Sequence, residues 1–241
     1  MKIINKLSAK AGDNSFAPAV TLAFLGDSVT QGCFDLMVRF DTGFDNVHDR
    51  ENAYPADVAR ILGVLYPTVP VNVINAGVAG KDAAHGLERL ERDVLSHKPD
   101  LTVVCFGLND CGKGEEGLER YTSALAQILD KIIASGSEVI FMTPNTMADT
   151  VSRRLTAPEI REIAKDVAAR QQDGILDRYV AAAKEVCTAK NVPVCDCYAI
   201  WRILRSGGVN TTHLLANYIN HPAKEMHWLF AYELVRTMFE Q

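Results

Sequence analysis

The 241-residue sequence lacks the features of a membrane, exported or nucleic-acid-binding protein. No hydrophobic run reaches the about 20 residues that a transmembrane helix needs, and residues 1–6 lack the long apolar core of a signal peptide. The net charge is -5, and no basic stripe is available to neutralise phosphates. The sequence therefore predicts no nucleic-acid partner and no membrane partner.

Cysteine is present but forms no recognisable framework. Cys105 and Cys195 lie inside apolar runs, where a free cysteine behaves as a small hydrophobic residue. The pair Cys195 and Cys197 has no second pair at zinc-like spacing. We therefore expect no metal, no cofactor and no disulfide framework, and a reduced, cytoplasmic protein.

The chain also lacks internal repeats, low-complexity tracts and Gly/Ser/Pro-rich linkers, so we expect a single domain over residues 1–241. Apolar strands alternate with amphipathic helical segments, which predicts a parallel sheet covered by helices on both faces. The expected strands are at about 20–26, 70–75, 101–107, 138–143 and 192–196. The expected helices are at about 53–66, 83–97, 117–135, 177–190 and 222–239.

Four short blocks place polar or small residues where chemistry is expected. In open α/β sheets, ligands bind at the carboxyl ends of the strands. Strand 20–26 leads into Asp27 and Ser28, the second strand leads to Gly80, and the third leads to Asn109. The fourth block, at residues 220–222, is Asn-His-Pro ahead of an apolar helix.

Histidine is the usual base that activates a serine hydroxyl, because its pKa lies near neutral pH. Among the six histidines, His221 is the best candidate. Pro222 suits the first position of a helix, which would make His221 the N-cap. The positive end of the helix dipole would then keep the imidazole neutral. His48 could also reach the site through its loop.

Together the four blocks resemble the GDSL esterase/lipase superfamily, also called SGNH hydrolases. The serine, glycine, asparagine and histidine of that name correspond to Ser28, Gly80, Asn109 and His221. The resemblance implies a flavodoxin-like three-layer α/β/α sandwich with a five-stranded parallel sheet of order 2-1-3-4-5. It also implies a catalytic serine, Ser28, and a catalytic base, His221. The implied oxyanion hole consists of the Ser28 and Gly80 N–H groups and the Asn109 amide.

One position departs from the family pattern. The usual last block has an aspartate three residues before the histidine, and here that position is Tyr218. We therefore predict a Ser-His dyad, in which a backbone carbonyl or amide oxygen from residues 217–220 orients the ring. Asp27 and Asp110 are expected to hold their turns through backbone N–H groups rather than to move protons.

Two long segments leave the carboxyl ends of strands, at residues 33–52 and 144–176. The first carries Phe34, Phe40 and Phe44, and the second contains an expected short helix from Pro158 onward. Loops in this position commonly set specificity. Surface packing or a subunit contact explains them equally well at this point.

The sequence thus predicts a serine hydrolase that cleaves carboxylic esters of small acyl groups through an acyl-enzyme. Acetyl on a carbohydrate is the preferred substrate, and a small-molecule ester is the expected partner. The alternative is a non-catalytic flavodoxin-like binding domain. The tyrosine at position 218, where the family has an aspartate, supports this alternative. A nucleotide-binding module is disfavoured, because Gly26 and Gly32 match neither phosphate-binding glycine motif. Nothing in the sequence indicates an oligomeric state.

Overall fold

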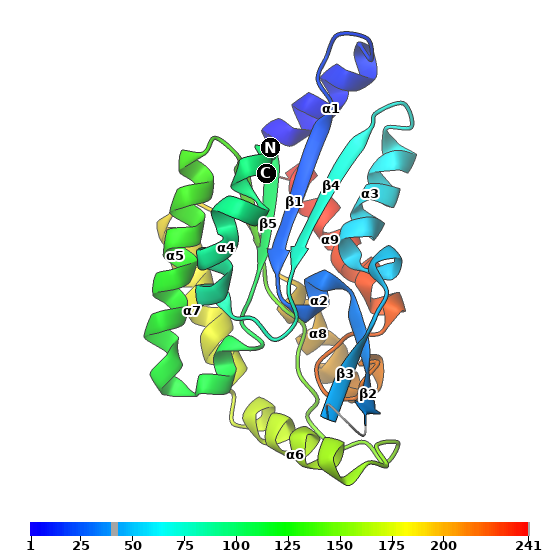
Figure 1. The fold of residues 1–241 in the computed structure, drawn as a ribbon, viewed down its shortest axis with the longest axis vertical. Helices are drawn as coiled ribbons and strands as arrows, with labels where there is room; N and C mark the ends of the chain where they lie inside the picture. Colours follow the sequence, from blue (N-terminus) through cyan, green and yellow to red (C-terminus); the bar gives the residue numbers. More distant parts are fainter. Residues whose placement is uncertain (40–42, 241) are drawn as a thin grey trace.

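The computed structural model describes residues 1–39 and 43–240. Phe40, one of the aromatic residues of the first long segment, lies outside them. Five parallel strands form the central sheet in the order β4-β1-β5-β6-β7 (Figure 1). Their bounds are Val71–Gly77 for β4, Val20–Gly26 for β1, Leu101–Cys105 for β5, Glu138–Met142 for β6 and Val194–Cys195 for β7. This order corresponds to the predicted 2-1-3-4-5, and the predicted fold class is confirmed.

The sheet is buried on both faces, which explains the nearly continuous apolar runs in its central strands. Every residue of β5 is buried, and so is every residue of β1 except Thr21. The register sets Gly26 opposite both Gly77 of β4 and Cys105 of β5. The carboxyl ends of these three strands therefore lie level with one another, and the segments that follow them meet at one edge of the sheet.

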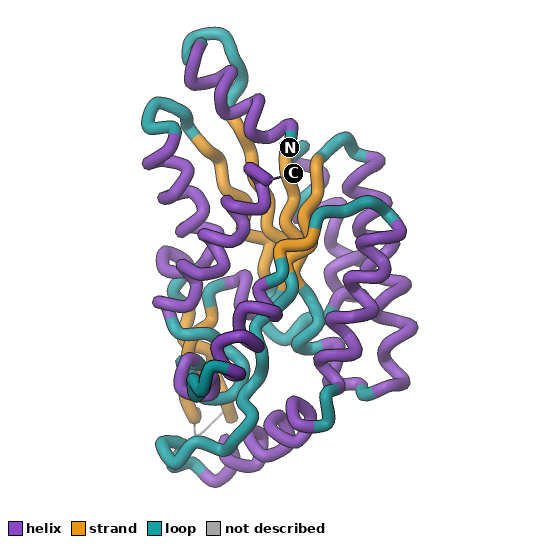
Figure 2. The backbone as a smooth tube through the Cα atoms, turned by 180° about the vertical axis from the view of Figure 1, so that it is seen from behind, coloured by secondary structure: helices purple, strands orange, loops and turns teal. Residues whose placement is uncertain are grey.

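Helices cover the two faces (Figures 1 and 2). One face carries α1 (Lys2–Gly12), α3 (Tyr54–Leu65) and α9 (Lys224–Glu240), and the other carries α4 (Ala83–Asp93), α5 (Leu118–Ala134) and α7 (Ile175–Ala189). On α5, predicted at about 117–135, the apolar residues Leu125, Ile128 and Ile132 are buried. Single turns of 3-10 helix lie at Arg50–Asn52, Leu95–His97, Asp110–Lys113, Glu115–Gly117 and Thr211–Leu214.

The structure corrects several sequence-based expectations. Helices α1 and α8 (Cys197–Ser206) were not expected, and α9 begins at Lys224 rather than at Pro222. Pro222 instead forms an antiparallel bridge with Leu215, and the Ala216 N–H donates to the His221 carbonyl at 2.8 Å. Because this small bridge holds the chain extended, His221 does not cap a helix.

The two long segments have regular structure that sequence patterning did not specify in full. The first contains an antiparallel hairpin of β2 (Cys33–Arg39) and β3 (Gly43–His48). The second contains α6 (Pro158–Gln172), which has proline in its first turn as expected but is longer than predicted. Both extend beyond the carboxyl ends of the sheet strands (Figure 1). In the part of the chain that the structure describes, we find no helix with the length and apolar character needed to span a membrane.

Candidate active site

Ser28 lies at the junction between β1 and α2 (Ser28–Gln31), a single helical turn that follows the strand at once. The preceding residue, Asp27, caps this turn, because its Oδ1 accepts a hydrogen bond from the Val29 N–H at 2.9 Å. Asp27 therefore acts on the backbone, as the sequence predicted. The cap fixes Ser28 at the carboxyl end of the central strand.

The tertiary structure brings His221 to Ser28, although 193 positions separate them in the sequence. The Nε2 atom of His221 lies 2.9 Å from Ser28 Oγ. The His221 backbone is held by Asn217, whose Oδ1 accepts hydrogen bonds from the N–H groups of Ile219, Asn220 and His221 at 3.0 Å each. One buried asparagine thus organises the loop that carries the histidine.

The surroundings of the second ring nitrogen of His221 differ from the prediction. Its Nδ1 atom is buried and has no hydrogen-bond partner among the described residues. The oxygen of Asn217 is already engaged by three backbone N–H groups, and its Nδ2 donates to Asn220 Oδ1 at 3.1 Å. The expected partner from residues 217–220 is therefore wrong, because the local turn uses that acceptor.

Burial governs the charge state of His221. The side chain is almost fully enclosed, and this desolvation lowers the pKa of His221 to about 4. The Phe34 backbone acts in the opposite direction and raises this pKa, as an acceptor near the ring does, although it makes no hydrogen bond of regular geometry to Nδ1. The ring is therefore neutral at pH 7 because it is buried, and not because of a helix dipole.

Gly80 and Asn109 reach the same cavity as Ser28 and His221. Gly80 has a φ of +71°, a left-handed conformation that favours glycine, and a Cβ there would meet open space. Its loop is positioned by Gln31, whose Oε1 accepts a hydrogen bond from the Ala79 N–H at 2.7 Å. The Asn109 amide donates one hydrogen to the Lys81 carbonyl at 3.0 Å, which leaves its second hydrogen for a ligand.

The sequence did not indicate which residues hold the ends of β1 and β4 and the α2 turn together. The Arg89 guanidinium of α4 is buried and donates to the Gly26 carbonyl at 2.8 Å and to the Ala76 carbonyl, which ties the ends of β1 and β4 together. Gly77 allows α2 to approach β4, since a Cβ there would lie 2.2 Å from the Gln31 backbone nitrogen. An arginine inside an amphipathic helix carries no sequence signal for this role.

Two buried carboxyl groups support the strand ends. Asp110 accepts hydrogen bonds from the Ala83 N–H at 2.9 Å and from the Gly107 N–H at 3.0 Å, which agrees with its predicted structural use. Burial raises the pKa of Asp27 to about 7 and that of Asp110 to about 6. The hydrogen bonds from the backbone lower both values, but desolvation is the larger effect in each case.

The four predicted residues line a cavity of about 220 Å³. The hairpin contributes Leu36 and Asn46, and α6 contributes Ile163 and Val167. Both long segments thus form part of the wall. The remaining lining residues are Ala79, Asn217, Ile219 and Asn220, so the described lining carries no Asp, Glu, Lys or Arg side chain.

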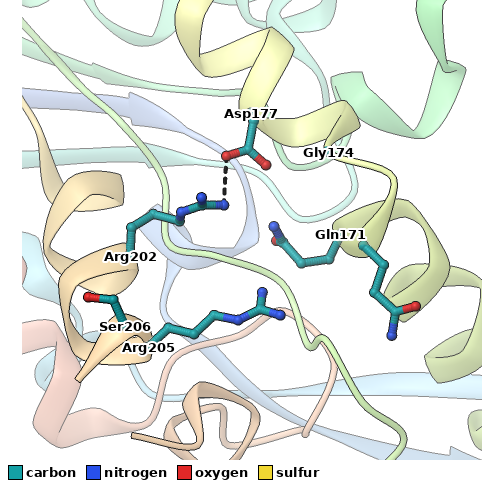
Figure 3. A pocket seen from close by; sticks show the side chains of 7 residues that line it. Gln171, Gly174, Asp177, Arg202, Arg205 and Ser206 are labelled. Carbon is teal, nitrogen blue, oxygen red and sulfur yellow. Dashed lines mark hydrogen bonds and ion pairs between the residues drawn. The ribbon is translucent and has the colours of Figure 1, made fainter. Parts of the chain in front are cut away.

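A larger cavity of about 570 Å³ lies elsewhere, between α8 and the segment that joins α6 to α7 (Figure 3). Its charged groups are already paired, because Arg202 contacts Asp177 at 2.9 Å and Arg205 contacts Asp149 at 3.0 Å. Gln171 is engaged with the Met147 N–H and the Tyr198 hydroxyl. None of the predicted site residues lines this cavity.

The other candidate histidines have different surroundings. His48 lies 3.3 Å from the Cys33 thiol, His85 contacts Asp82 at 2.7 Å, and His213 packs edge-on against Tyr218. His227 is buried, and its Nδ1 accepts a hydrogen bond from the Tyr54 N–H at 3.0 Å. None of them has a hydrogen bond to Ser28 Oγ among the described residues. No group of three or more His, Cys, Asp or Glu residues in the described ranges is arranged to hold a metal ion.

The tyrosine at the expected aspartate position is turned toward a different residue. Tyr218 has a φ of +54°, and its hydroxyl accepts a hydrogen bond from Arg154 at 2.9 Å. The Arg154 guanidinium carbon also lies 5.8 Å from the centre of the Tyr218 ring. Tyr218 therefore interacts with the loop after β6.

Comparison with known proteins agrees with this fold. Residues 24–229 match the model of the GDSL-like lipase/acylhydrolase family. The chain belongs to the GDSL-like lipase/acylhydrolase family.

Two curated relatives are esterases. An acetylxylan esterase from Geobacillus stearothermophilus is 26% identical over 132 residues, which cover 51% of this chain and 58% of that protein. An arylesterase from Vibrio mimicus is 35% identical over 72 residues, which cover 30% of this chain and 36% of that protein. Each match thus spans less than two thirds of the relative.

Solved structures share the fold. A two-domain esterase active on acetylated mannans superposes with a TM-score of 0.69 at 18% identity, covering 99% of this chain and 52% of that one. A catalytic mutant of the Geobacillus stearothermophilus acetylxylan esterase superposes with a TM-score of 0.66 at 20% identity. The match covers 92% of this chain and 95% of that one. A lipase/acylhydrolase from Enterococcus faecalis superposes with a TM-score of 0.66 at 22% identity, and the match covers 91% of this chain and 95% of that one. The catalytic mutants described for the acetylxylan esterase replace a serine, an aspartate or a histidine.

Proposed function

We propose that this protein is a serine esterase that removes small acyl groups through an acyl-enzyme, with Ser28 as nucleophile and His221 as general base. The observation that carries the proposal is the 2.9 Å separation of Ser28 Oγ and His221 Nε2. A serine hydroxyl is a weak nucleophile until an adjacent base takes its proton. A buried, neutral imidazole within hydrogen-bond reach is such a base.

In the acylation step, Ser28 Oγ attacks the carbonyl carbon of the ester while its proton passes to His221 Nε2. The tetrahedral intermediate carries its negative charge on the former carbonyl oxygen. The N–H groups of Ser28 and Gly80 and the amide of Asn109 are the donors we assign to this oxygen. Collapse of the intermediate breaks the bond to the alcohol, which leaves with the proton held on His221.

Deacylation follows the same route with water in place of the alcohol. Water gives a proton to His221 Nε2 and attacks the acyl carbon, and Ser28 Oγ leaves with that proton. The imidazolium forms briefly in both steps. No carboxylate stabilises it at the position where the family has one, since Tyr218 faces Arg154. The nearby Phe34 backbone, which favours the protonated ring, is our candidate for this role.

The size of the cavity supports a small acyl group. Ligand pockets commonly measure about 300–1,000 Å³, whereas this one has about 220 Å³. Apart from His221, whose ring is neutral at pH 7, the described lining carries no ionisable side chain, and this favours a neutral ester. The acetylxylan esterase and the esterase active on acetylated mannans point to acetyl on a carbohydrate as the substrate. A cytoplasmic location remains a prediction from the sequence.

The test combines turnover with covalent labelling. The wild type should hydrolyse p-nitrophenyl acetate and react with a fluorophosphonate probe, which adds one phosphonyl group at Ser28. Ser28→Ala should lose both reactions while its melting temperature changes little. Ser8→Ala, which alters a serine exposed on α1, is the matched control and should keep both. A chain that neither turns over the ester nor takes up the probe would instead favour the non-catalytic binding domain.

A further inference from the structure

We infer that Asn46 of the hairpin selects esters whose alcohol part carries a free hydroxyl beside the ester. This inference rests on the proposed function and concerns the same cavity. It assigns a specificity role to a residue of the segment that follows the candidate nucleophile. Asn46 is half-buried and lines the cavity together with Ser28 and His221.

The hairpin presents one face to the cavity. Leu36 and Asn46 are opposite one another in the β2–β3 register, so their side chains share a face, and both line the cavity. Their neighbours Met37 and Val47 lie on the other face and are exposed. Phe34 lies at an irregularity of the β2–β3 register, between Cys33 and Asp35, and is buried, with its ring centroid 4.8 Å from that of the His227 ring. This aromatic contact packs the start of the hairpin against α9.

Asn46 is the lining asparagine whose side chain is uncommitted. Asn217 uses both ends of its amide within the histidine loop, and Asn220 uses its oxygen to accept from Asn217. Asn109 donates to Lys81 and faces the oxyanion position that we propose. Within the described ranges the Asn46 side chain makes no hydrogen bond, so both its donor and its acceptor are available to a ligand.

The surroundings of this amide make it selective. Leu36, Ile163, Val167 and Ile219 supply the apolar part of the same lining. A polar group placed among apolar walls is left unpaired when the ligand offers no partner, and that loss discriminates against such ligands. A hydroxyl satisfies either end of the amide, because it is both donor and acceptor. Charged groups gain no counterion from this lining.

The experiment compares three acetyl esters with the intact chain. Methyl 3-O-acetyl-β-D-xylopyranoside has hydroxyls on both sides of the ester, its 2,4-dideoxy analogue has none, and p-nitrophenyl acetate reports the chemistry alone. The wild type should prefer the hydroxylated ester by about tenfold in kcat/KM, the size expected for one well-placed hydrogen bond. Asn46→Ala should abolish this preference, because the variant loses turnover of the hydroxylated ester and not of its dideoxy analogue.

Val47→Ala is the matched control, because Val47 lies on the outer face of the same strand, and it should keep the full preference. An Asn46→Ala variant that retains the preference, or a wild type that hydrolyses both sugar esters equally well, would overturn the inference. An equal loss on all three esters would also overturn it, since that result indicates a general role in the fold.

A binding measurement separates this inference from the proposed function. In a Ser28→Ala background, calorimetric titration with the hydroxylated ester should show affinity about tenfold weaker once Asn46→Ala is added. This result does not depend on turnover. If the wild type hydrolyses none of the esters, the proposed function fails, while the titration still decides the role of Asn46.

Discussion

The Oγ atom of Ser28 lies 2.9 Å from Nε2 of His221, while the other ring nitrogen of His221 is buried without a hydrogen-bond partner among the described residues. Accepting the serine proton at Nε2 requires that Nδ1 carry the ring hydrogen. The catalytic mutants of one similar protein, the Geobacillus stearothermophilus acetylxylan esterase, replace a serine, an aspartate or a histidine. In this chain, Tyr218 stands where the family pattern has an aspartate three residues before the histidine.

Removing the imidazole should be about as damaging as removing the hydroxyl, because the two groups act as a unit. We expect His221→Ala to lower kcat for p-nitrophenyl acetate by about 10⁴-fold or more, and the double variant with Ser28→Ala to be no worse than either single one. Steady-state rates of the three variants give the comparison. Additive losses would show that the two side chains contribute independently.

The pH dependence of kcat/KM should have its acidic limb near pH 4. The pKa of His221 is lowered by burial from 6.5 to about 4, so the free enzyme keeps a neutral base at all higher pH values. Activity should therefore rise as pH increases through about 4 and stay level from about 5.5 to neutrality. This limb is measured from initial rates with a substrate that does not ionise in this pH range. The fold of the protein is checked at the acidic end. A limb near 6.5 would mean that the ring is solvated in the working enzyme.

Asn109→Ala should lower kcat by about 10²–10³-fold with a smaller effect on KM, because an oxyanion donor acts mainly in the transition state. The hydrogen bond from the Asn109 amide to the Lys81 carbonyl is lost as well, so the melting temperature must be recorded with the kinetics. Asn72→Ala alters an asparagine of β4 that bonds Thr21 away from the cavity, and it serves as control. A rise in KM alone would contradict an oxyanion role.

Widening the α6 wall should move the acyl preference toward longer chains. Ile163 and Val167 are one helical turn apart and both line the cavity. Val167→Ala should raise the butyrate-to-acetate ratio of kcat/KM by about tenfold, within the range of a methylene-sized change in a hydrophobic pocket. The p-nitrophenyl esters of the two acids provide the measurement. Ala169→Gly, which removes a methyl from α6 outside this lining, should leave the ratio unchanged.

Asp27 should make stability fall as pH rises from about 4 to about 7. Its native pKa is raised to about 7 from an ordinary 3.8, so the folded chain holds a proton that the unfolded chain has released across this window. Asn can still accept the hydrogen bond from the Val29 N–H as a cap. We therefore expect Asp27→Asn to gain stability relative to the wild type as pH increases from 4 to 8. Denaturant titrations at several pH values test this, and a constant difference would contradict it.

The strands and the four blocks could be predicted from the sequence because their signals are local. An apolar run such as residues 101–105, followed by Asn109 and Asp110, indicates a buried strand that ends at a turn, whatever the rest of the chain does. The order of the strands and the meeting of Ser28 with His221 came from the family resemblance. Residue spacing alone does not contain them, because they depend on which strand ends become neighbours.

Only the tertiary structure decided what surrounds the histidine and what closes the cavity. Pro222 in the sequence predicted a helix that starts directly after His221. In the structure Pro222 pairs with Leu215, and the helix begins at Lys224. The neutral ring is a consequence of burial among distant segments. Likewise, the sequence of residues 33–48 does not say which face of the hairpin turns inward. Leu36 and Asn46 line the cavity, while Phe34 at the start of the same hairpin packs against His227 of α9. Contacts between segments so far apart in the chain are not encoded in the local residue pattern.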